Sequence, residues 1–364
     1  MPEKKTRLAL VLPSLHAGGM EKVMAELGNY FSIKPDFEVH LILFGNSPKI
    51  FFPINSGIKI HKQDRLLKSR PKVLEGLKTL RFIRKEIKSI RPVSVLSFGT
   101  QWNNLVLLAL LNTSIPVFVS DRGSPARKYK FSTELFRSAL YPKASGIIAQ
   151  TEKAKNILRN RFPSSKIKTI GNPIPSSTES GNTEKINTIL TVGRLIESKH
   201  HDRLIKIFSR LKAPEWKLII VGGEALKEKN FEKLKKLIRD LNLEERVVLT
   251  GEQKNTDQYY KESSIFAFNS SIEGFPNVVG EALSAGLPVV SYDCVAGPSE
   301  MITNGENGFL VPVFNDEQFR EKLQLLIDNE NLRKKMAEKA RESISKFSIE
   351  TIGKQYLDFI LPGS

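Results

Sequence analysis

The sequence has a single cysteine, Cys294, among 364 residues, so no disulfide can form within the chain. This excludes a disulfide-stabilised scaffold and favours a reducing compartment, with the cytoplasm as the default. Nowhere do about 18 apolar residues run together, so no segment is expected to span a membrane as a helix. The short apolar run Leu8–Leu12 leads into Gly18-Gly19, and we interpret it as a first buried strand rather than a signal peptide.

Several ligand-binding motifs are also missing. Neither Gly18-Gly19 nor Gly222-Gly223 completes the Gly-x-Gly-x-x-Gly pattern of dinucleotide-dependent dehydrogenases. Zinc-finger spacing and aromatic ribonucleoprotein boxes do not occur, so nucleic acid is not an expected partner. Asp-x-Asp, the usual metal clamp for a nucleotide diphosphate, is absent too. We therefore expect neither a metal nor another cofactor.

Acidic residues are scarce in the first half of the chain. Residues 1–170 hold 30 Lys and Arg against 11 Asp and Glu, whereas residues 171–364 hold 26 against 28, so the first half carries the whole net charge of +17. Such a surface attracts nucleic acid or anionic membrane. Without a nucleic-acid motif, we expect peripheral association with the anionic cytoplasmic face of a membrane.

The segment Lys72–Arg91 reads as a basic amphipathic helix. Its apolar stripe can pack on a sheet with the basic side chains in water, and the same side chains can also face an anionic bilayer. Each basic side chain would then contribute about 1 kcal/mol to the free energy of membrane binding. The apolar positions are Val73, Leu77, Leu80, Ile83, Ile87 and Ile90, and the basic positions between them are Lys78, Arg81, Arg84, Lys85, Lys88 and Arg91.

Short apolar runs alternate with helical patterns along the chain, which is typical of parallel sheets with crossover helices. The fold class we expect is α/β, with two doubly wound Rossmann-like domains facing a cleft. The first domain covers residues 1–170 and the second covers 188–348. The linker, 171–187, is rich in Gly, Pro, Ser and Asn. A last helix, about 349–364, is expected to cross back onto the first domain.

The expected strands are short. In the first half they are Leu8–Leu12, Val39–Phe44, Val93–Phe98, Val117–Ser120 and Gly146–Ala149. In the second half they are Thr188–Val192, Leu218–Val221, Val247–Thr250, Ile265–Phe268 and Val289–Ser291. Two helices are expected over Asp316–Lys346, and one more over Ile349–Ile360.

The segment Gly193-Arg194-Leu195 follows an expected strand directly, and Lys199 comes five residues after Arg194. Glycine permits close approach of a ligand to the backbone, and two cations can converge on one diphosphate. Each charge-assisted contact contributes about 1.5–3 kcal/mol. Taken alone, this segment fits a solvated loop better than a ligand site. His200 and His201 are expected to flank it without taking part in chemistry.

A second segment, Glu273–Glu281, follows the expected strand Ile265–Phe268. Pro276 presets the geometry of a helix start. Free amides at a helix N-terminus bind anions, so the backbone of Phe275, Asn277 and Val278 can hold a phosphate. Glu273 would lie ahead of the helix beside a sugar ring, and Glu281 would accept from ribose hydroxyls. Alternatively, Glu273 is a helix cap and Glu281 a solvated helix residue.

Taken together, these segments resemble the retaining glycosyltransferases of family 4, which have the two-domain glycosyltransferase-B fold. The resemblance covers nearly the whole chain, and the combined order of the motifs is highly specific. The segments that carry it are Gly18-Gly19-Met20-Glu21, Asn172-Pro173, Gly193-Arg194-Leu195 with Lys199, Glu273 and Glu281, Gly297-Pro298-Ser299-Glu300, and Asn304-Gly305-Glu306-Asn307-Gly308.

The resemblance implies a role for each motif. Arg194 and Lys199 would bind the diphosphate, Glu281 the ribose and Glu273 the donor sugar hydroxyls. The Gly18-Gly19 loop would face the phosphate or the acceptor. Residues 1–170 would bind the acceptor and residues 188–348 the nucleotide sugar. Family members with a cysteine before the Gly-Pro segment often build bacterial surface glycans on lipid carriers, so a lipid-linked saccharide is the implied acceptor.

The sequence departs from the family pattern at one place. Many members carry a histidine near the reacting sugar, where this chain has Ser120–Pro125. Asp121 could accept a hydrogen bond from the sugar or the acceptor hydroxyl, and Arg122 could stand beside a phosphate. Alternatively, both residues only shape the loop. His16 is a weaker candidate, and Asn103 could line the acceptor cleft.

The reaction we expect is retaining, metal-independent transfer of a hexose or N-acetylhexosamine from a nucleotide sugar, a UDP-sugar in the first instance, to a polyprenyl-diphosphate-linked saccharide. Arg194, Lys199 and the helix amides would stabilise the leaving diphosphate. Its oxygen would take the acceptor proton in a front-face substitution, with water excluded. A nucleotide-sugar epimerase of the same fold and a non-catalytic anionic-lipid binding module are the alternatives.

Overall fold

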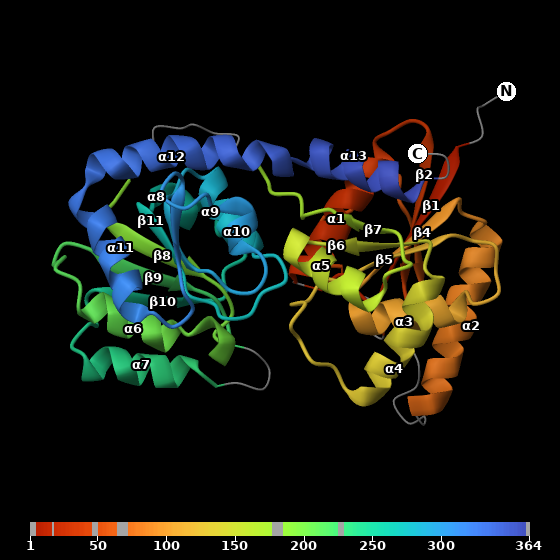
Figure 1. Cartoon of the computed structure of the whole chain (residues 1–364), viewed down its shortest axis with the longest axis horizontal. Helices are drawn as coiled ribbons and strands as arrows, with labels where there is room; N and C mark the ends of the chain where they lie inside the picture. Colours follow the sequence, from red (N-terminus) through yellow and green to blue (C-terminus); the bar gives the residue numbers. More distant parts are fainter. Residues whose placement is uncertain are drawn as a thin grey trace. The chain divides into compact units, whose positions relative to one another are not determined.

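The structure, a computed structural model, describes residues 5–16, 18–45, 50–63, 72–176, 185–224 and 229–361. The chain forms two compact units (Figure 1). Unit 1 comprises Met1–Pro173 and Ile349–Ser364, and unit 2 comprises Ile174–Ser348. Residues 177–184 of the expected linker lie outside the described residues. Within the described residues, none of the helices combines the length and apolar character needed to cross a membrane.

Unit 1 is built on a parallel sheet, which in the described residues has seven strands in the order β3-β2-β1-β4-β5-β6-β7. Its strands are β1 (Thr6–Leu12), β2 (Phe37–Leu43), β3 (Lys59–Lys62), β4 (Ser94–Phe98), β5 (Val117–Ser120), β6 (Gly146–Ala149) and β7 (Ile167–Thr169). Its helices are α1 (Gly19–Ser32), α2 (Lys72–Ile90), α3 (Thr100–Ala109), α4 (Phe131–Leu140), α5 (Glu152–Arg161) and α13 (Ile349–Ile360), and a 3-10 turn spans Tyr141–Lys143.

The helices of unit 1 cover both faces of its sheet. One core cluster contains apolar side chains of α2, α3 and α5 packed on the strands. On α2, Ile83 and Ile87 are fully buried there, whereas Leu77, nearer the start, is half exposed. Helix α13 packs on α1, where a Cβ added to Gly353 would lie 2.3 Å from the Tyr30 ring. The last helix of the chain is therefore part of unit 1.

Unit 2 is built on a second parallel sheet, with six strands in the described residues in the order β10-β9-β8-β11-β12-β13. Its strands are β8 (Thr188–Val192), β9 (Lys217–Val221), β10 (Val247–Gly251), β11 (Ile265–Phe268), β12 (Val289–Tyr292) and β13 (Gly308–Val311). Its helices are α6 (His201–Ser209), α7 (Phe231–Asp240), α8 (Asp257–Glu262), α9 (Asn277–Ser284), α10 (Pro298–Met301), α11 (Asp316–Asp328) and α12 (Glu330–Ile344). Two 3-10 turns span Glu197–Lys199 and Ser345–Phe347.

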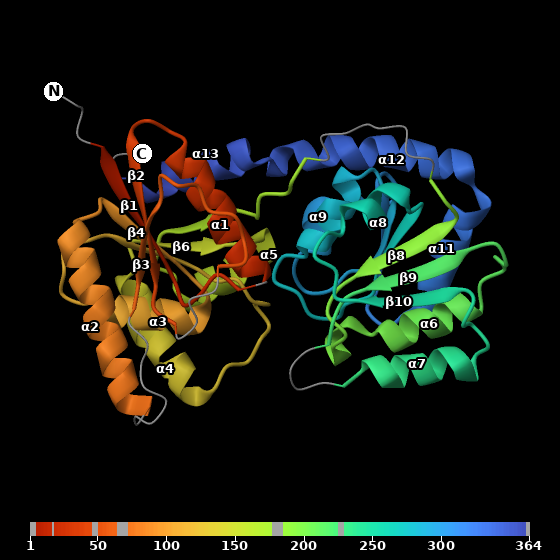
Figure 2. The same ribbon diagram turned by 180° about the vertical axis from the view of Figure 1, so that it is seen from behind.

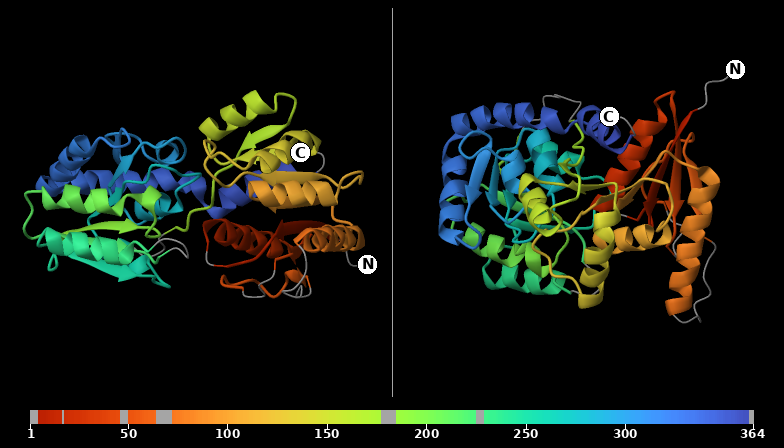
Figure 3. Two further views of the ribbon diagram at one scale, coloured as in Figure 1. Left: turned by 90° about the horizontal axis from the view of Figure 1, so that it is seen from below. Right: turned by 45° about the vertical axis from the view of Figure 1, so that its right-hand side comes forward.

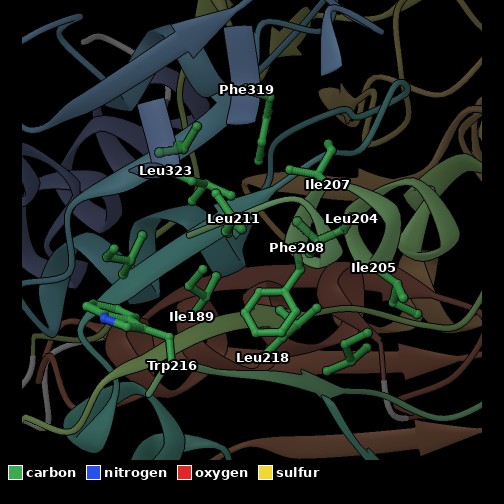
Figure 4. Close-up of a cluster of buried hydrophobic side chains, with 14 of the residues drawn as sticks. Ile189, Leu204, Ile205, Ile207, Phe208, Leu211, Trp216, Leu218, Phe319 and Leu323 are labelled. Atoms are coloured by element: carbon green, nitrogen blue, oxygen red, sulfur yellow. The ribbon is translucent and has the colours of Figure 1, made fainter. Parts of the chain in front are cut away.

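The main core of unit 2 lies between its sheet and the helices α6, α7 and α11 (Figure 4). Phe208 of α6 and Phe319 of α11 are fully buried in it. Helices α8 and α9 lie on the other side of the strands (Figure 2). Both faces of the sheet are thus covered, as parallel sheets require.

The strand order of each sheet reverses once. In unit 1 the chain runs outward from β1 to β3, then returns to the other side of β1 with β4, and in unit 2 the same happens between β8 and β11. Ligands of open parallel sheets bind outside the carboxyl ends of the strands at this switch point. Ligand-binding residues are therefore expected on the loops after β1, β4, β8 and β11.

Candidate functional site

In unit 2, the sequence motifs meet at the switch point. Strands β8 and β11 pair in parallel, so their carboxyl ends lie side by side. The loop after β8 carries Gly193 to Lys199, and the loop after β11 carries Asn269 to Pro276. Two motifs that are far apart in the sequence are thereby brought to one edge of the sheet.

Lys199 and Glu273 form an ion pair across these two loops. The side chain of Lys199 is 17% exposed and that of Glu273 is 14% exposed, so water screens the pair only weakly. The Lys199 ammonium also lies 5.2 Å from the centre of the Phe268 ring. A cation and a carboxylate are therefore held together where a charged, hydroxyl-rich ligand could replace part of their contact.

A set of hydrogen bonds holds the two loops together. Ser271 donates its backbone N–H to the Ser198 carbonyl at 3.0 Å. The side chain of Asn269 donates to the His200 carbonyl at 2.5 Å, and the His200 Nε2 and Ser271 Oγ atoms are 2.7 Å apart. The sequence reasoning missed Asn269 and Ser271, although a polar run directly after a buried strand is a usable signal. His200 thus positions the loop.

Close backbone packing fixes the Gly193 turn. A Cβ added to Gly222 would lie 1.9 Å from the Gly193 carbonyl oxygen, so only glycine fits at position 222. Leu195 donates to the Gly223 carbonyl at 2.9 Å. The Arg194 side chain is exposed beyond this turn. It is free to approach a ligand while its backbone is held in place.

His201 supports the same turn from inside unit 2. It is buried, and its Nε2 atom lies 3.3 Å from the Arg194 carbonyl oxygen, to which it donates. Burial lowers the pKa of His201 to about 4. The ring is therefore neutral near pH 7, and it acts through the backbone of Arg194.

Helix α9 begins at the expected place, with Pro276 at its N-cap. In the described residues, the backbone N–H groups of Phe275 and Val278 have no backbone acceptor. The third expected amide differs, because Asn277 already donates to the Phe275 carbonyl at 3.1 Å. Phe275 is itself buried, in edge-to-face contact with Phe347. Two free amides remain at this helix N-terminus for an anion.

The loop after β12 supports this helix start. Gly297 has a φ of +122°, and an added Cβ would lie 2.1 Å from Cδ of Pro276. Cys294, in the same loop, is buried. Burial and the nearby Glu273 carboxylate raise the pKa of its thiol to about 12. Cys294 is therefore an unreactive packing residue behind the Glu273 loop.

Glu281 lies in the second turn of α9 and is half buried. The hydroxyl of Tyr260, a buried residue of α8, donates to its Oε2 atom at 3.1 Å. Burial and this carboxylate hold the pKa of Tyr260 well above its usual value. Tyr260 thus orients Glu281. This buried partner argues against the alternative interpretation, in which Glu281 is only a solvated helix residue.

The Gly18-Gly19 loop of unit 1 leads into α1 at the other switch point. Gly18 is the N-cap of α1 and has extended backbone, with no side-chain cap. A Cβ at Gly18 would lie 2.3 Å from Oε2 of Glu21, so the carboxylate folds back over the helix start. Gly19 and His16 are exposed. The loop is accessible, as a phosphate or acceptor loop would have to be.

Asp121 follows β5, and its carboxylate is surrounded by donors. It pairs with Arg137, and its Oδ1 atom accepts from Thr100 Oγ1 at 2.9 Å and from Tyr141 Oη at 2.5 Å. Arg137 and Tyr141 are buried. These contacts favour the interpretation in which Asp121 shapes the loop, because both carboxylate oxygens already have partners.

Arg122 has a different environment. It donates to Asn172 Oδ1 at 2.5 Å and to the Tyr356 hydroxyl at 3.1 Å, and its guanidinium lies 4.3 Å from the centre of the Phe98 ring. Burial lowers its pKa, and Tyr356 and the Glu21 carboxylate oppose this effect only in part. In the part of the chain that the structure describes, its Nε atom is buried without a partner. Among the described residues, Arg122 therefore keeps one hydrogen-bond donor without a partner, whereas both carboxylate oxygens of Asp121 have partners.

Asn103 lies inside unit 1 and has no exposed surface. Its amide donates to the Ser120 carbonyl at 3.0 Å and to Tyr141 Oη at 3.1 Å, and its oxygen accepts from Ser97 Oγ at 2.9 Å. It ties the ends of β4 and β5 together and does not line a surface that an acceptor could reach. The expectation for Asn103 therefore has to be corrected.

Among the residues that the structure describes, no three or more His, Cys, Asp or Glu side chains lie together in a group that could hold a metal ion. The groups gathered at the β8–β11 switch point of unit 2 are cations, helix amides, and carboxylates that already have partners. Such a set can bind an anionic, hydroxyl-rich ligand.

Comparison with known proteins agrees with this geometry. Residues 17–178 match the family described as Glycosyltransferase Family 4, and residues 175–343 match Glycosyl transferases group 1. The chain is 31% identical to the N-acetylgalactosamine-N,N'-diacetylbacillosaminyl-diphospho-undecaprenol 4-alpha-N-acetylgalactosaminyltransferase of Campylobacter jejuni, over 98% of this chain and 99% of that one. The chain belongs to glycosyltransferase family 4. The resemblance seen in the sequence is thus confirmed.

Other bacterial glycosyltransferases are similar along nearly the whole chain. The amylovoran biosynthesis glycosyltransferase AmsD of Erwinia amylovora is 28% identical over 95% of this chain and 96% of its own length. An uncharacterized glycosyltransferase of Haemophilus influenzae is 30% identical over 92% and 94%. This family 4 chain is therefore an enzyme that transfers a sugar.

Solved structures agree with the fold. TarM has a TM-score of 0.81 at 16% identity, covering 98% of this chain and 99% of its own. The lipopolysaccharide outer core galactosyltransferase WaaB has a TM-score of 0.78 at 23% identity, covering 97% and 99%. With the two doubly wound sheets, these likenesses confirm the glycosyltransferase-B fold expected from the sequence.

Proposed function

We propose that this family 4 glycosyltransferase moves a hexose or N-acetylhexosamine from a UDP-sugar to a saccharide carried on polyprenyl diphosphate, with retention of anomeric configuration, in the synthesis of a bacterial surface glycan. Two similar Campylobacter jejuni enzymes are named for transfer to undecaprenol-linked saccharides. A neighbour in structure, HepE of Anabaena, was solved with UDP. Family membership, the relatives' names and the site chemistry support the proposal.

The observation that carries the proposal is that four groups lie on the loops after β8 and β11 and on the helix α9 that follows: the exposed Arg194, the Lys199–Glu273 pair, the free amides at the start of α9, and Glu281 with its Tyr260 partner. Cations and amides suit a diphosphate, and carboxylates suit ribose and sugar hydroxyls. One nucleotide sugar would use all of them.

Each group would have a separate task. Arg194, Lys199 and the amides of Phe275 and Val278 would hold the diphosphate, and they would stabilise the negative charge that grows on it as the anomeric bond breaks. Glu281 would hold the ribose. Glu273 would accept hydrogen bonds from hydroxyls of the transferred sugar. Its ion pair with Lys199 would weaken as the lysine ammonium turns toward the phosphate.

On the acceptor side, we assign the phosphate-facing role to Arg122 and the Gly18-Gly19 loop. The buried Nε of Arg122, without a partner among the described residues, supports this choice over Asp121. Asp121 would act by holding the loop in shape through Arg137. The acceptor hydroxyl would then lose its proton to the leaving phosphate oxygen, with no protein base required.

Catalysis is proposed to need no metal, because protein cations would balance the diphosphate. Addition of EDTA should leave the rate of sugar transfer unchanged. Loss of the rate with EDTA, and its recovery with Mg²⁺ or Mn²⁺, would overturn this part of the proposal.

We further propose that the enzyme works at the cytoplasmic face of a membrane, where a lipid-linked acceptor is found. The exposed basic side chains of α2, such as Lys78, Arg81, Lys85 and Lys88, support attraction to anionic lipid. Binding to anionic vesicles should weaken as salt rises, since the attraction is screened.

The decisive experiment is a panel of UDP-sugars, each incubated with the protein and a polyprenyl-diphosphate saccharide. Extraction of labelled sugar into the lipid phase supports the proposal. Formation of an epimer of the UDP-sugar without transfer would instead make the protein an epimerase. No turnover with any donor, together with vesicle binding, would leave an anionic-lipid binding module.

A further inference from the structure

Helix α4 turns its apolar side chains toward solvent. Phe131 is 83% exposed, Leu135 59% and Phe136 49%. Phe131 and Leu135 are four residues apart and therefore neighbours on the helix surface. Phe136 lies at the edge of the same exposed half of the helix, while Arg137 and Leu140 are buried. A helix on a protein surface normally has the reverse pattern. Three large apolar side chains exposed together on one helix indicate a partner.

The orientation of α4 is fixed by ion pairs, so this apolar face cannot simply turn inward. On its buried side, Arg137 pairs with Asp121. Glu134 of α4 pairs with Arg161 of α5 at 2.5 Å. Rotation of the helix would break both pairs and would leave the Asp121 carboxylate buried without its cation. The outward face is therefore a stable feature of unit 1.

The charge around this face indicates which partner it fits. Arg127, Lys128 and Lys130 precede α4 directly, and all three are exposed. The amino-terminal ends of α2 and α4 lie at the same edge of unit 1, and α3 packs against both helices (Figures 1 and 3). Near that end of α2, Leu74 and Leu77 are also about half exposed.

A second copy of this chain would bring the same excess of positive charge to the apolar face, and the two surfaces would repel. An anionic bilayer offers an apolar interior beneath a negative surface. It therefore complements both the apolar and the basic side chains.

We propose that Phe131, Leu135 and Phe136 of α4 insert into the interfacial layer of an anionic bilayer, with the basic segment Arg127–Lys130 against the lipid headgroups. This inference rests on the membrane association proposed above, and it replaces a general attraction by a defined contact surface. Because Arg137 joins α4 to Asp121 at the end of β5, the docked helix fixes the acceptor-side loop relative to the membrane.

Vesicle sedimentation tests the insertion. A variant with Phe131→Gln, Leu135→Gln and Phe136→Gln keeps good helix formers but removes the apolar face. It should need at least about tenfold more phosphatidylglycerol-containing vesicles for half-maximal binding. The matched control is Ile33→Gln, at a residue of unit 1 that is 70% exposed outside the patch, and it should bind like the wild type. Equal binding of the triple variant and the wild type would overturn the proposal.

The basic segment is tested separately. Arg127→Ala, Lys128→Ala and Lys130→Ala together should weaken binding at low salt and reduce its dependence on salt. An unchanged salt dependence would remove the headgroup contact from the proposal. Equal binding of the wild type to phosphatidylglycerol vesicles and to pure phosphatidylcholine vesicles would also remove the headgroup contact from the proposal.

A fluorescent probe gives an independent readout. Cys294 is 1% exposed, so a thiol-reactive, environment-sensitive dye should label Phe131→Cys selectively. Its emission should shift to the blue when anionic vesicles are added, whereas a dye on Ile33→Cys should not respond. No shift at position 131 would refute the insertion.

Two further measurements show whether a negative result concerns the membrane contact surface or the proposed function. Size-exclusion chromatography should give the same apparent mass for the wild type and the triple Gln variant, whereas a dimer that only the wild type forms would assign the patch to a second copy instead. Sugar transfer to a short water-soluble acceptor should be unchanged in the triple variant. If no sugar is transferred by any form but vesicle binding still depends on α4, the proposed function fails and the contact surface stands.

Discussion

Substitution of Lys199 by methionine is expected to lower both the stability of unit 2 and the rate of sugar transfer. The Lys199 and Glu273 side chains are only 17% and 14% exposed. Removing one partner of a buried ion pair costs about 3–5 kcal/mol, because the other charge stays behind without compensation. The remaining access to water reduces this to about 2–3 kcal/mol here.

A double-mutant cycle with Glu273→Gln isolates the pair. Each single variant leaves one charge without its partner, whereas the double variant removes both. The double variant should therefore lose less stability than the sum of the singles, by about 1–2 kcal/mol. Urea unfolding can be followed in a Trp102→Phe background, in which Trp216 of unit 2 is the only tryptophan left. Additive losses would refute the pairing.

The same variants test the role of Lys199 in the reaction. A charge-assisted contact with the leaving diphosphate contributes about 1.5–3 kcal/mol, which corresponds to roughly 10- to 150-fold in rate. Lys199→Met should reduce kcat/KM by this factor, with the unfolded fraction accounted for from the urea curves. A kcat/KM equal to that of the wild type would refute the assignment of Lys199 to the diphosphate.

Three other substitutions have distinct expected effects. Arg194→Ala should lower kcat far more than it weakens UDP binding measured by calorimetry, because its contact strengthens as charge develops; equal kcat would remove it from the site. Gly297→Ala should cost about 2–4 kcal/mol of stability, because its Cβ would meet Cδ of Pro276 at 2.1 Å and its φ is +122°; a urea midpoint unchanged from wild type would contradict this packing. The pKa of His201 falls from 6.5 in the unfolded chain to about 4 in the folded one, so stability should drop by roughly 1.4 kcal/mol per pH unit as pH falls from about 6.5 to 4. His201→Gln should flatten that part of the pH profile, and an equal slope in both proteins would show that another group is responsible.

The central strands of both sheets could be predicted because burial on two faces leaves a short, continuous apolar run. Strands β5, β8 and β11 have the predicted bounds, and β1 and β9 begin only one or two residues earlier. The strands that sequence reasoning missed are β3, β7 and β13, and all three are edge strands. In β3, Lys59–Lys62 is largely exposed, so no apolar pattern distinguishes it from a loop.

The residues of the site could be predicted where a motif follows a strand, as at Arg194 and Glu273. Their mutual contacts could not, because these depend on which strands are neighbours. The pairing of β8 with β11 brings Lys199 to Glu273 across a long separation in sequence. For the same reason, the sequence could not decide between Asp121 and Arg122. The donors that occupy Asp121 come from α3, α4 and the turn after α4.

Asn103 is a residue for which the sequence predicted a site role that its burial does not support. Its place after an expected strand suggested an accessible polar residue, but it is the fourth residue of α3, where it bonds to Ser97 and Ser120 at the strand ends and is fully buried. The outward apolar face of α4 was not predicted either, because a helical pattern alone does not say which side of the helix packs on the sheet. Both cases reflect tertiary packing, which local patterns do not encode.

The central claim is that this enzyme transfers a sugar from a UDP-sugar with retention at the switch-point site of unit 2. Proton NMR of the product formed from an α-linked UDP-sugar and a polyprenyl-diphosphate saccharide tests it most directly. The account predicts a new glycosidic linkage whose anomeric proton has the small coupling of an α-linkage, with the product greatly reduced for Arg194→Ala. A β-linked product, or equal product from Arg194→Ala, would contradict it.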